Sequence, residues 1–219
     1  MKRSLIVITS VVAMAALFII GAVVYSNKSA DQSQNLAVEN SAALNRFSSI
    51  TYGPADAKVH IVEFMDPACE ACSQFYPFVK NIINSNPGKI KLTVRYANFH
   101  PGSDYVAQVL EAARAQGKFW PALEALFATQ DQWASHHAPA PETVWQYLGH
   151  LGLDFDQMRK DMNEPKVMAV IEQDRADVKA LQITKTPSFY VNNKPLMKFG
   201  HEQLNQLINS ELAIAYPGQ

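Results

Sequence analysis

The pattern of apolar and polar positions divides this chain into three parts. An uncharged and largely apolar run covers residues 4–27. A polar segment with few aromatic side chains follows at 28–49. Apolar positions spaced as in packed strands and helices begin near Ile50. We therefore predict a membrane anchor or signal at 1–27, a polar linker at 28–49 and a folded domain at 50–219.

The apolar run is long enough to cross a membrane. A helix needs about 20 apolar residues to span a bilayer, whereas a cleavable signal has only about 7–15 and then a small-x-small site. The best candidate for such a site, residues 24–26, fits only tolerably. We favour an uncleaved anchor through residues 4–27 and keep a cleaved signal as the alternative. Because Lys2 and Arg3 precede the run, we expect the rest of the chain on the periplasmic side of an inner membrane, after a single pass.

The polar segment at 28–49 allows two interpretations. As flexible coil, about 25 residues give an end-to-end distance of roughly 25–30 Å, which suits a tether. Alternatively, its few apolar side chains form a short amphipathic helix for self-association, although helices this short are marginal alone. These side chains are Leu36, Val38, Ala43, Leu44 and Phe47.

The folded part reads as strands and helices in the order β-α-β, a helical block, then β-β-α. The expected elements are a buried strand at 58–65, a helix from Cys72 ended by 86–88, a strand at 89–99, helices over about 102–181, strands at 188–191 and 195–199, and a helix at about 201–212. Pro77 lies inside the first helix and predicts a kink there.

Both cysteines of the chain lie within four consecutive positions, as Cys69-x-x-Cys72 between the first strand and the first helix. Unsatisfied N–H groups and the positive dipole end of a helix stabilise a thiolate, which few ordinary cysteines form at neutral pH. We expect Cys69 to be the nucleophile and Cys72 to resolve the mixed disulfide. The alternatives are a static disulfide or half of a metal site.

A metal site needs further ligands, which here must come from histidine. None of the six stands at a ligand spacing from the cysteines, so we expect no metal and no other cofactor. They are His60, His100, His136, His137, His150 and His201.

The composition of the chain argues against wholesale disorder and against binding to nucleic acids. The chain is 48% hydrophobic and 18% charged, which allows a packed core and argues against wholesale disorder. The formal net charge is −1, and no cluster of Lys and Arg would follow a phosphate backbone. We therefore expect no nucleic-acid partner.

Three features resemble the thioredoxin superfamily, and within it the DsbA-like thiol-disulfide oxidoreductases. They are the segment "VEFMDPACEAC", the helical block between the two halves of the sheet, and "ITKTPSFYV". The resemblance runs from about residue 53 to 212. It implies an α/β, thioredoxin-like fold with a helical insertion at about 102–181, preceded here by an N-terminal transmembrane helix.

The resemblance also implies roles for three more residues. Glu63 stands six positions before Cys69, where the superfamily has a buried acid whose raised pKa lets it take the proton of Cys72. The alternative is a solvated glutamate.

Pro187 is expected to follow a cis bond beside Cys69, and the backbone of Thr186 to hydrogen-bond an extended substrate. The alternative is an ordinary trans proline.

We therefore predict an extracytoplasmic enzyme that exchanges disulfides with cysteines of client proteins and is recycled by a membrane redox partner. The direction of electron flow stays open. Glu70 and Ala71, between the cysteines, include neither the histidine of strong oxidants nor the proline of thioredoxins, so we expect the pKa of Cys69 well above about 3.5. The alternative function is a non-catalytic chaperone or metal-binding protein with the same fold.

Overall fold

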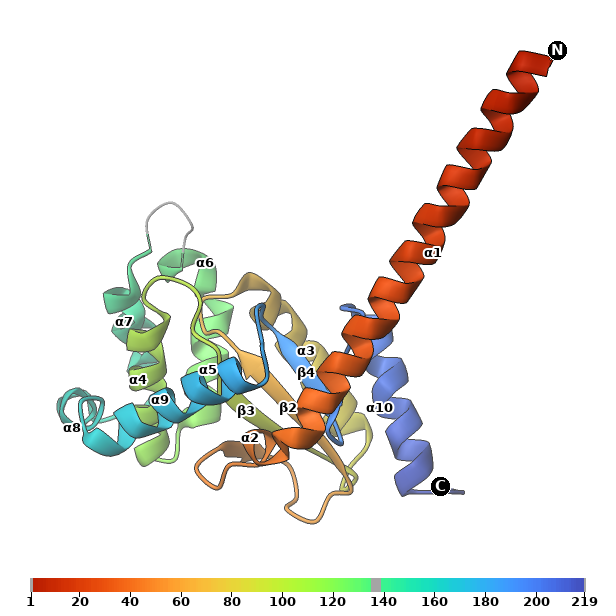
Figure 1. The fold of residues 1–219 in the computed structure, drawn as a ribbon. Coiled ribbons are helices and arrows are strands. Elements are labelled where there is room, and N and C mark those ends of the chain that lie inside the picture. The colour runs from red at the N-terminus through yellow and green to blue at the C-terminus, as the bar shows by residue number, and fades with distance from the viewer. Residues whose placement is uncertain (1, 135–138, 219) are drawn as a thin grey trace.

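A mixed five-stranded sheet lies at the centre of the described part of the chain, in the order β1-β3-β2-β4-β5. The central strand β2 (Val59–Met65) pairs parallel with β3 (Ile90–Tyr96) and antiparallel with β4 (Ser188–Val191). Two short strands, β1 (Ile50–Tyr52) and β5 (Lys194–Pro195), form the edges, both antiparallel to their neighbours. This computed structural model describes residues 2–134 and 139–218, with side chains from residue 11 onward (Figure 1).

Alternation along β2 divides the core into two halves. Val59, Ile61 and Met65 belong to the larger cluster of buried side chains, on the face that α3 and α10 cover. Val62 and Phe64 point the other way, into a smaller cluster beneath α2 and α9. Because helices cover both faces, nearly every position of β2 is buried, as the run of apolar and β-branched residues predicts.

The helices of the domain follow the predicted order. The first, α3 (Glu70–Ser85), continues through Pro77 and ends at Asn86. The last, α10 (His201–Ala215), packs against β2 and β4. Between them lies the helical block, which consists of α4 (Ser103–Ala115), α5 (Phe119–Ala128), α6 (Gln130–Trp133), η1 (Pro141–Val144), α7 (Trp145–Leu148), η2 (Gly149–Leu151), α8 (Phe155–Asp161) and α9 (Pro165–Ala180).

The predicted strand at 195–199 is wrong beyond its first residue, because β5 ends at Pro195. Proline has no N–H for a sheet ladder and is confined to strand edges. Leu196 still donates its N–H to the carbonyl of Phe189 at 2.8 Å, and the chain then turns away to reach α10. The segment 196–199 is therefore a loop that borders β4 without extending the sheet.

Of the two interpretations of the polar segment, flexible coil is wrong for the part up to Leu44, which is helical as in the alternative; the self-association proposed with that alternative stays a prediction. A single helix, α1 (Lys2–Glu39), continues through the first 12 residues of that segment, and α2 (Ser41–Leu44) follows directly. Ala43 and Leu44 are buried against the domain's own second cluster, which orders a segment whose composition alone would not. Phe47 has no such contact and is fully exposed, at 106%.

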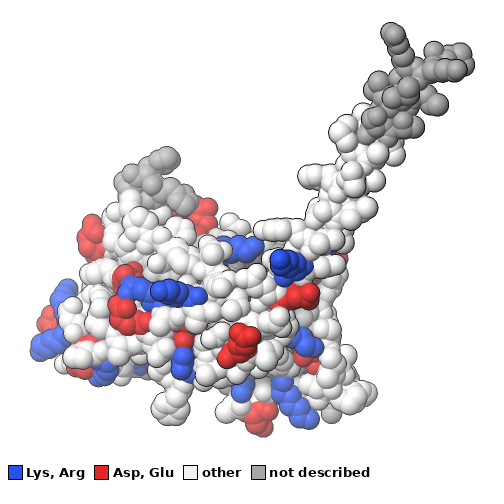
Figure 2. Space-filling model, viewed as in Figure 1, with Lys and Arg blue, Asp and Glu red and all other residues white. Residues whose placement is uncertain are grey.

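The N-terminal part of α1 projects from the domain (Figure 1). From Val11, the helix is long and apolar enough to cross a membrane, and none of its apolar window is buried. The surface view shows no Lys, Arg, Asp or Glu on the described part of this projection (Figure 2). On the domain face in the same view, blue and red groups are interspersed, without a large patch of one sign.

A buried ion-pair network fastens the segment after α1 to the domain. Arg95, on β3, is fully buried and donates to Asp174 at 2.8 Å and to Asp177 at 2.6 Å, both on α9. It also donates to the backbone carbonyl of Ala43. Arg46 completes the network through two bonds to Asp177, at 2.9 and 2.6 Å. Strand β3, helix α9 and the chain that leads to α1 thus share one cluster of charges.

Candidate active site

The cysteine pair lies where β2 passes into α3. Cys69 occupies the N-cap position of α3, with extended backbone angles, and Cys72 lies in the first helical turn. Cys69 is 6% exposed and Cys72 is 0% exposed. Cys69 is thus the more accessible residue of a pair that is buried as a whole.

The loop before β4 lies against this pair. The peptide bond between Thr186 and Pro187 is cis, as predicted. The Cys69 Sγ donates to the carbonyl oxygen of Thr186 at 3.4 Å, although the two residues are 117 positions apart in the sequence. The fold thus brings together the two motifs that the sequence singled out.

The two thiols have opposite acid strengths. The pKa of Cys69 is lowered to about 5, mainly because the Cys72 thiol donates to its sulfur, and also through Thr186 and the N–H groups of Ala71 and Cys72; burial opposes the shift. The pKa of Cys72 is raised well above the ordinary value by burial, by its bond to Cys69 and by the charge of Glu63. At neutral pH the pair therefore holds one thiolate, on Cys69, and one thiol.

Glu63 is buried beneath the pair. It lies on β2, on the same sheet face as Ile61 and Met65, and is 1% exposed, so the alternative of a solvated glutamate is wrong. Burial, with a smaller contribution from the charge of Cys69, raises the pKa of Glu63 to about 8. A carboxyl group with this pKa takes up and gives back a proton near neutral pH.

Asp66, which the sequence analysis missed, supports the turn that carries the cysteines. It is fully buried and accepts hydrogen bonds from the backbone N–H groups of Ala68 at 2.9 Å, Phe99 at 2.6 Å and His100 at 2.8 Å. The Ser103 hydroxyl and the His100 Nδ1 also bond to it. Its own N–H donates to the Cys72 sulfur at 3.5 Å. The sequence signal that could have identified Asp66 is an acidic side chain directly after a buried strand.

Gln130 was missed as well, because no local pattern separates it from the other polar residues of the helical block. Its side chain is buried, at 5% exposure, and the Nε2 group donates to the carbonyl oxygens of Pro67 at 2.8 Å and Cys69 at 3.1 Å. The helical block thereby holds the backbone on which Cys69 stands. Gln130 does not bond to the Cys69 sulfur; it holds the backbone that positions this sulfur.

Other side chains that the sequence raised as metal ligands are engaged elsewhere or lie outside the described residues. His60 bonds to Thr93 at 2.7 Å, and burial lowers its pKa to about 4. His136 and His137 are not among the described residues. In the described part of the chain, no three His, Cys, Asp or Glu side chains are grouped so that they could hold a metal ion.

Comparison with known proteins decides the family. Residues 45–210, about three quarters of the chain, match the profile of the family described as Thioredoxin. The chain belongs to this family.

Solved structures agree with this assignment. A thioredoxin-like oxidoreductase from Silicibacter pomeroyi DSS-3 is 29% identical, with a TM-score of 0.68 over 80% of this chain and 98% of that one. The oxidised BdbD of Bacillus subtilis is 23% identical, with a TM-score of 0.65 over 75% and 92%. The thiol-disulfide exchange protein alpha-DsbA2 from Wolbachia pipientis is 18% identical, with a TM-score of 0.69 over 84% and 97%. The predicted DsbA-like thioredoxin fold with its inserted helices is confirmed.

The curated relatives are much longer proteins. The Na(+)/H(+) antiporter NhaA of Herminiimonas arsenicoxydans is 31% identical over 144 residues, which are 66% of this chain and 22% of that protein. NhaA 3 of Salinispora tropica is 30% identical over 149 residues, or 21% of its length. The chain thus spans about a fifth of these relatives, and their antiport activity does not carry over to it.

The raised pKa of Glu63 makes stability depend on pH. In the folded, reduced protein Glu63 keeps its proton up to a pKa of about 8, whereas the unfolded chain releases it near the ordinary value of 4.5. The folded state therefore binds more protons in this window, and Glu63 lowers the stability as the pH rises through it. We therefore compare the stability of Glu63→Gln with that of the unchanged protein at two pH values. The difference should be more favourable to the variant at about pH 8 than at about pH 5, by on the order of a few kcal/mol. Urea unfolding of the reduced proteins measures this.

The exposed Glu202 provides the control for that comparison. Glu202→Gln should shift stability equally at both pH values. If Glu63→Gln behaves in the same way as Glu202→Gln, the carboxyl of Glu63 is ionised in the folded protein and the assignment fails.

The role of Gln130 predicts an effect on the nucleophile without direct contact. Gln130→Leu leaves the carbonyl groups of Pro67 and Cys69 without their donor, which costs about 1–3 kcal/mol of stability for a buried unsatisfied group. As the backbone at Cys69 relaxes, its sulfur loses alignment with the N–H groups of α3, and its pKa should rise. Thiolate absorbance during a pH titration measures that pKa. Gln116→Leu is the control, because Gln116 also bonds to the backbone, at Asp154, but in an exposed place. Identical titrations for the two variants would contradict the role.

Proposed function

We propose that this protein exchanges disulfides with cysteines of other proteins outside the cytoplasm. The observation that carries the proposal is the asymmetry of the pair: a stabilised thiolate at the more accessible Cys69 and a protonated, buried thiol at Cys72. A static structural disulfide has no use for this asymmetry. An exchange reaction requires this asymmetry, because the attacking sulfur must be ionised and the resolving sulfur must stay protonated until the mixed disulfide has formed.

The reaction consists of two successive thiol-disulfide exchange steps. In the reducing direction, the Cys69 thiolate attacks a client disulfide, and one client sulfur leaves as a thiolate. In the mixed disulfide Cys69 no longer carries the charge that helps to raise the pKa of Glu63. Ionised Glu63 then takes the proton of Cys72, whose sulfur attacks Cys69, releases the second client sulfur as a thiolate and forms the Cys69–Cys72 disulfide. Two electrons pass from the pair to the client. The oxidising direction is the reverse, in which Glu63 returns the proton to Cys72.

The cis-proline loop supplies the place for the client. The carbonyl oxygen of Thr186 lies 3.4 Å from the Cys69 sulfur, so its backbone lies at the reacting sulfur. An extended client segment can pair with this backbone as an added strand does, while Pro187 fixes the direction of the loop. Thr186 and Pro187 are therefore the proposed substrate-binding residues.

Each turnover leaves the pair in the opposite redox state, so a second thiol-disulfide partner must restore it. We place this partner in the membrane, because the apolar part of α1 provides a single-pass anchor for the domain. In this arrangement residues 1–27 anchor the protein in the inner membrane, and the domain from residue 50 onward works on the periplasmic side.

The order of attack can be tested by trapping. Cys72→Ser removes the resolving sulfur, so mixed disulfides between Cys69 and client proteins should accumulate in cells and separate on non-reducing gels. Cys69→Ser should trap none. Equal trapping by both variants would refute the assigned order. If neither variant traps clients and Cys69→Ser still suppresses aggregation as well as the unchanged protein, the non-catalytic chaperone is the better description.

The anchor can be tested by fractionation. Because the apolar run is too long for a typical cleaved signal, the mature protein should sediment with membranes and retain that run when its N-terminus is sequenced. A protein in the soluble extract with a mature N-terminus near Asn27 would establish a cleaved signal in place of an anchor.

A further inference from the structure

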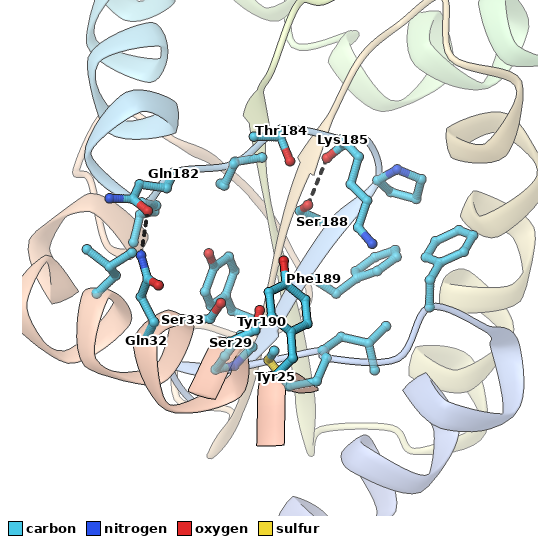
Figure 3. Close-up of a pocket in the computed structure, with 18 residues that line it drawn as sticks. Tyr25, Ser29, Gln32, Ser33, Gln182, Thr184, Lys185, Ser188, Phe189 and Tyr190 are labelled. Carbon is cyan, nitrogen blue, oxygen red and sulfur yellow. Dashed lines mark hydrogen bonds between the residues drawn. The ribbon is translucent and has the colours of Figure 1, made fainter. Parts of the chain in front are cut away.

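A groove lies between α1 and the loop that carries the cis-proline (Figure 3). Its volume is about 480 Å³. Tyr25, Ser29 and Ser33 of α1 form one wall. The opposite wall consists of residues 181–185 and Pro187, with β4 and the segment 195–199 completing the lining. One end of the groove thus reaches the residue next to Thr186.

The two walls are held together by specific contacts. Gln32 of α1 donates from Nε2 to the Oε1 of Gln182 at 3.0 Å. On the loop side, the Ser188 hydroxyl donates to the carbonyl of Lys185 at 2.8 Å, which fixes the backbone from which the Lys185 side chain departs. Both bonds are visible in Figure 3. The groove is therefore formed by ordered elements on both sides.

Lys185 gives the groove its charge. Among the described lining residues it alone carries a formal charge, and no carboxylate accompanies it. Figure 3 shows its side chain entering the hollow from the loop, on the opposite side from α1. The same lining also carries hydroxyl groups, namely those of Tyr25, Ser29, Ser33, Thr184, Ser188 and Tyr190. A groove with one ammonium group and several hydroxyl donors, without a competing acid in its described lining, is complementary to a carboxylate.

The position of the groove indicates what delivers that carboxylate. Lys185 precedes Thr186, whose carbonyl lies 3.4 Å from the Cys69 sulfur. An extended chain advances about 3.3 Å per residue, and alternate side chains point to the same side. A client that presents its cysteine to Cys69 therefore places a side chain two residues away at the entrance of the groove.

We propose that this groove is a client subsite that binds an Asp or Glu side chain two residues from the reacting client cysteine, with α1 as one of its walls. The proposal rests on the disulfide exchange proposed above and adds a specificity to it. It also gives α1 a second role, because the helix that anchors the protein then contributes directly to substrate selection.

The test uses the full chain in detergent micelles, in the Cys72→Ser form, so that one reaction step is observed. The Cys69 thiolate attacks a peptide disulfide, forms the mixed disulfide and releases one thiol, which is measured over time. Two peptides are compared that differ only by Asp or Asn two residues from the cysteine. Each rate constant is expressed relative to that for bis(2-hydroxyethyl) disulfide, which has neither a flanking peptide nor a carboxylate to occupy the groove.

We expect the Asp peptide to react about 5–10-fold faster than the Asn peptide, as a partly exposed charge-assisted hydrogen bond allows. Lys185→Gln should abolish this preference, whereas Lys198→Gln, a neighbouring cation outside the lining, should leave it unchanged. Ser33→Trp fills the groove and should slow both peptides relative to bis(2-hydroxyethyl) disulfide. Asn35→Trp, on α1 outside the lining, should not.

Three results would overturn the proposal. These are equal rates for the two peptides, a preference that survives Lys185→Gln, or a Ser33→Trp variant that behaves like Asn35→Trp. A loss of the preference in nanodiscs of anionic lipid, but not of neutral lipid, would assign the groove to a lipid headgroup instead. A protein that also fails to react with bis(2-hydroxyethyl) disulfide would refute the proposed exchange itself, and the subsite with it.

Discussion

The buried carboxylate of Asp66 is the constraint on which the rest of the site depends. A buried charge is tolerated only where hydrogen bonds replace its lost hydration, and three backbone N–H groups, a hydroxyl and an imidazole do so here. These donors come from both the turn before the cysteines and the junction between β3 and α4. One side chain therefore closes the end of the sheet against the helical block and fixes the turn from which α3 departs.

This closure explains why the two cysteines differ so strongly although they share one turn. Cys72 faces the dry side of the junction, above Glu63, and remains a thiol. Cys69 faces the cis-proline loop, and its sulfur accepts hydrogen bonds from N–H groups in the first turn of α3. Gln130 holds the same turn from the helical block, so the block is part of the machinery that sets the reactivity of the pair. The pKa of about 5 for Cys69 lies above that of the strongest oxidants, as the sequence led us to expect, although the largest cause is the Cys72 thiol and not the residues between the cysteines.

The parts of the structure that could be predicted from the sequence are those with a local signal. The cysteine pair, the Thr-Pro bond and Glu63 stand at fixed offsets from recognisable strands, and the periodicity of those strands follows from burial on both faces. Asp66, Gln130 and Arg95 could not be assigned in this way, because most of their partners lie between 33 and 82 positions away and become neighbours only in the fold. For the same reason the sequence left coil and helix open at 28–49 and gave no sign that Ala43 and Leu44 are buried against the domain: a polar composition predicts coil unless the surface against which it packs is known.

The network of Arg95 and Arg46 with Asp174 and Asp177 has a mechanical consequence. In the proposed membrane-anchored arrangement, a force on α1 reaches the domain through the contacts that hold its C-terminal end. The two arginines pass part of this force into α9 and β3, and the bond between Gln32 and Gln182 passes part of it into the loop that carries the cis-proline. The turn from Asp66 to Cys72 takes part in neither contact, so the anchor is coupled to the site through the loop that lies against Cys69.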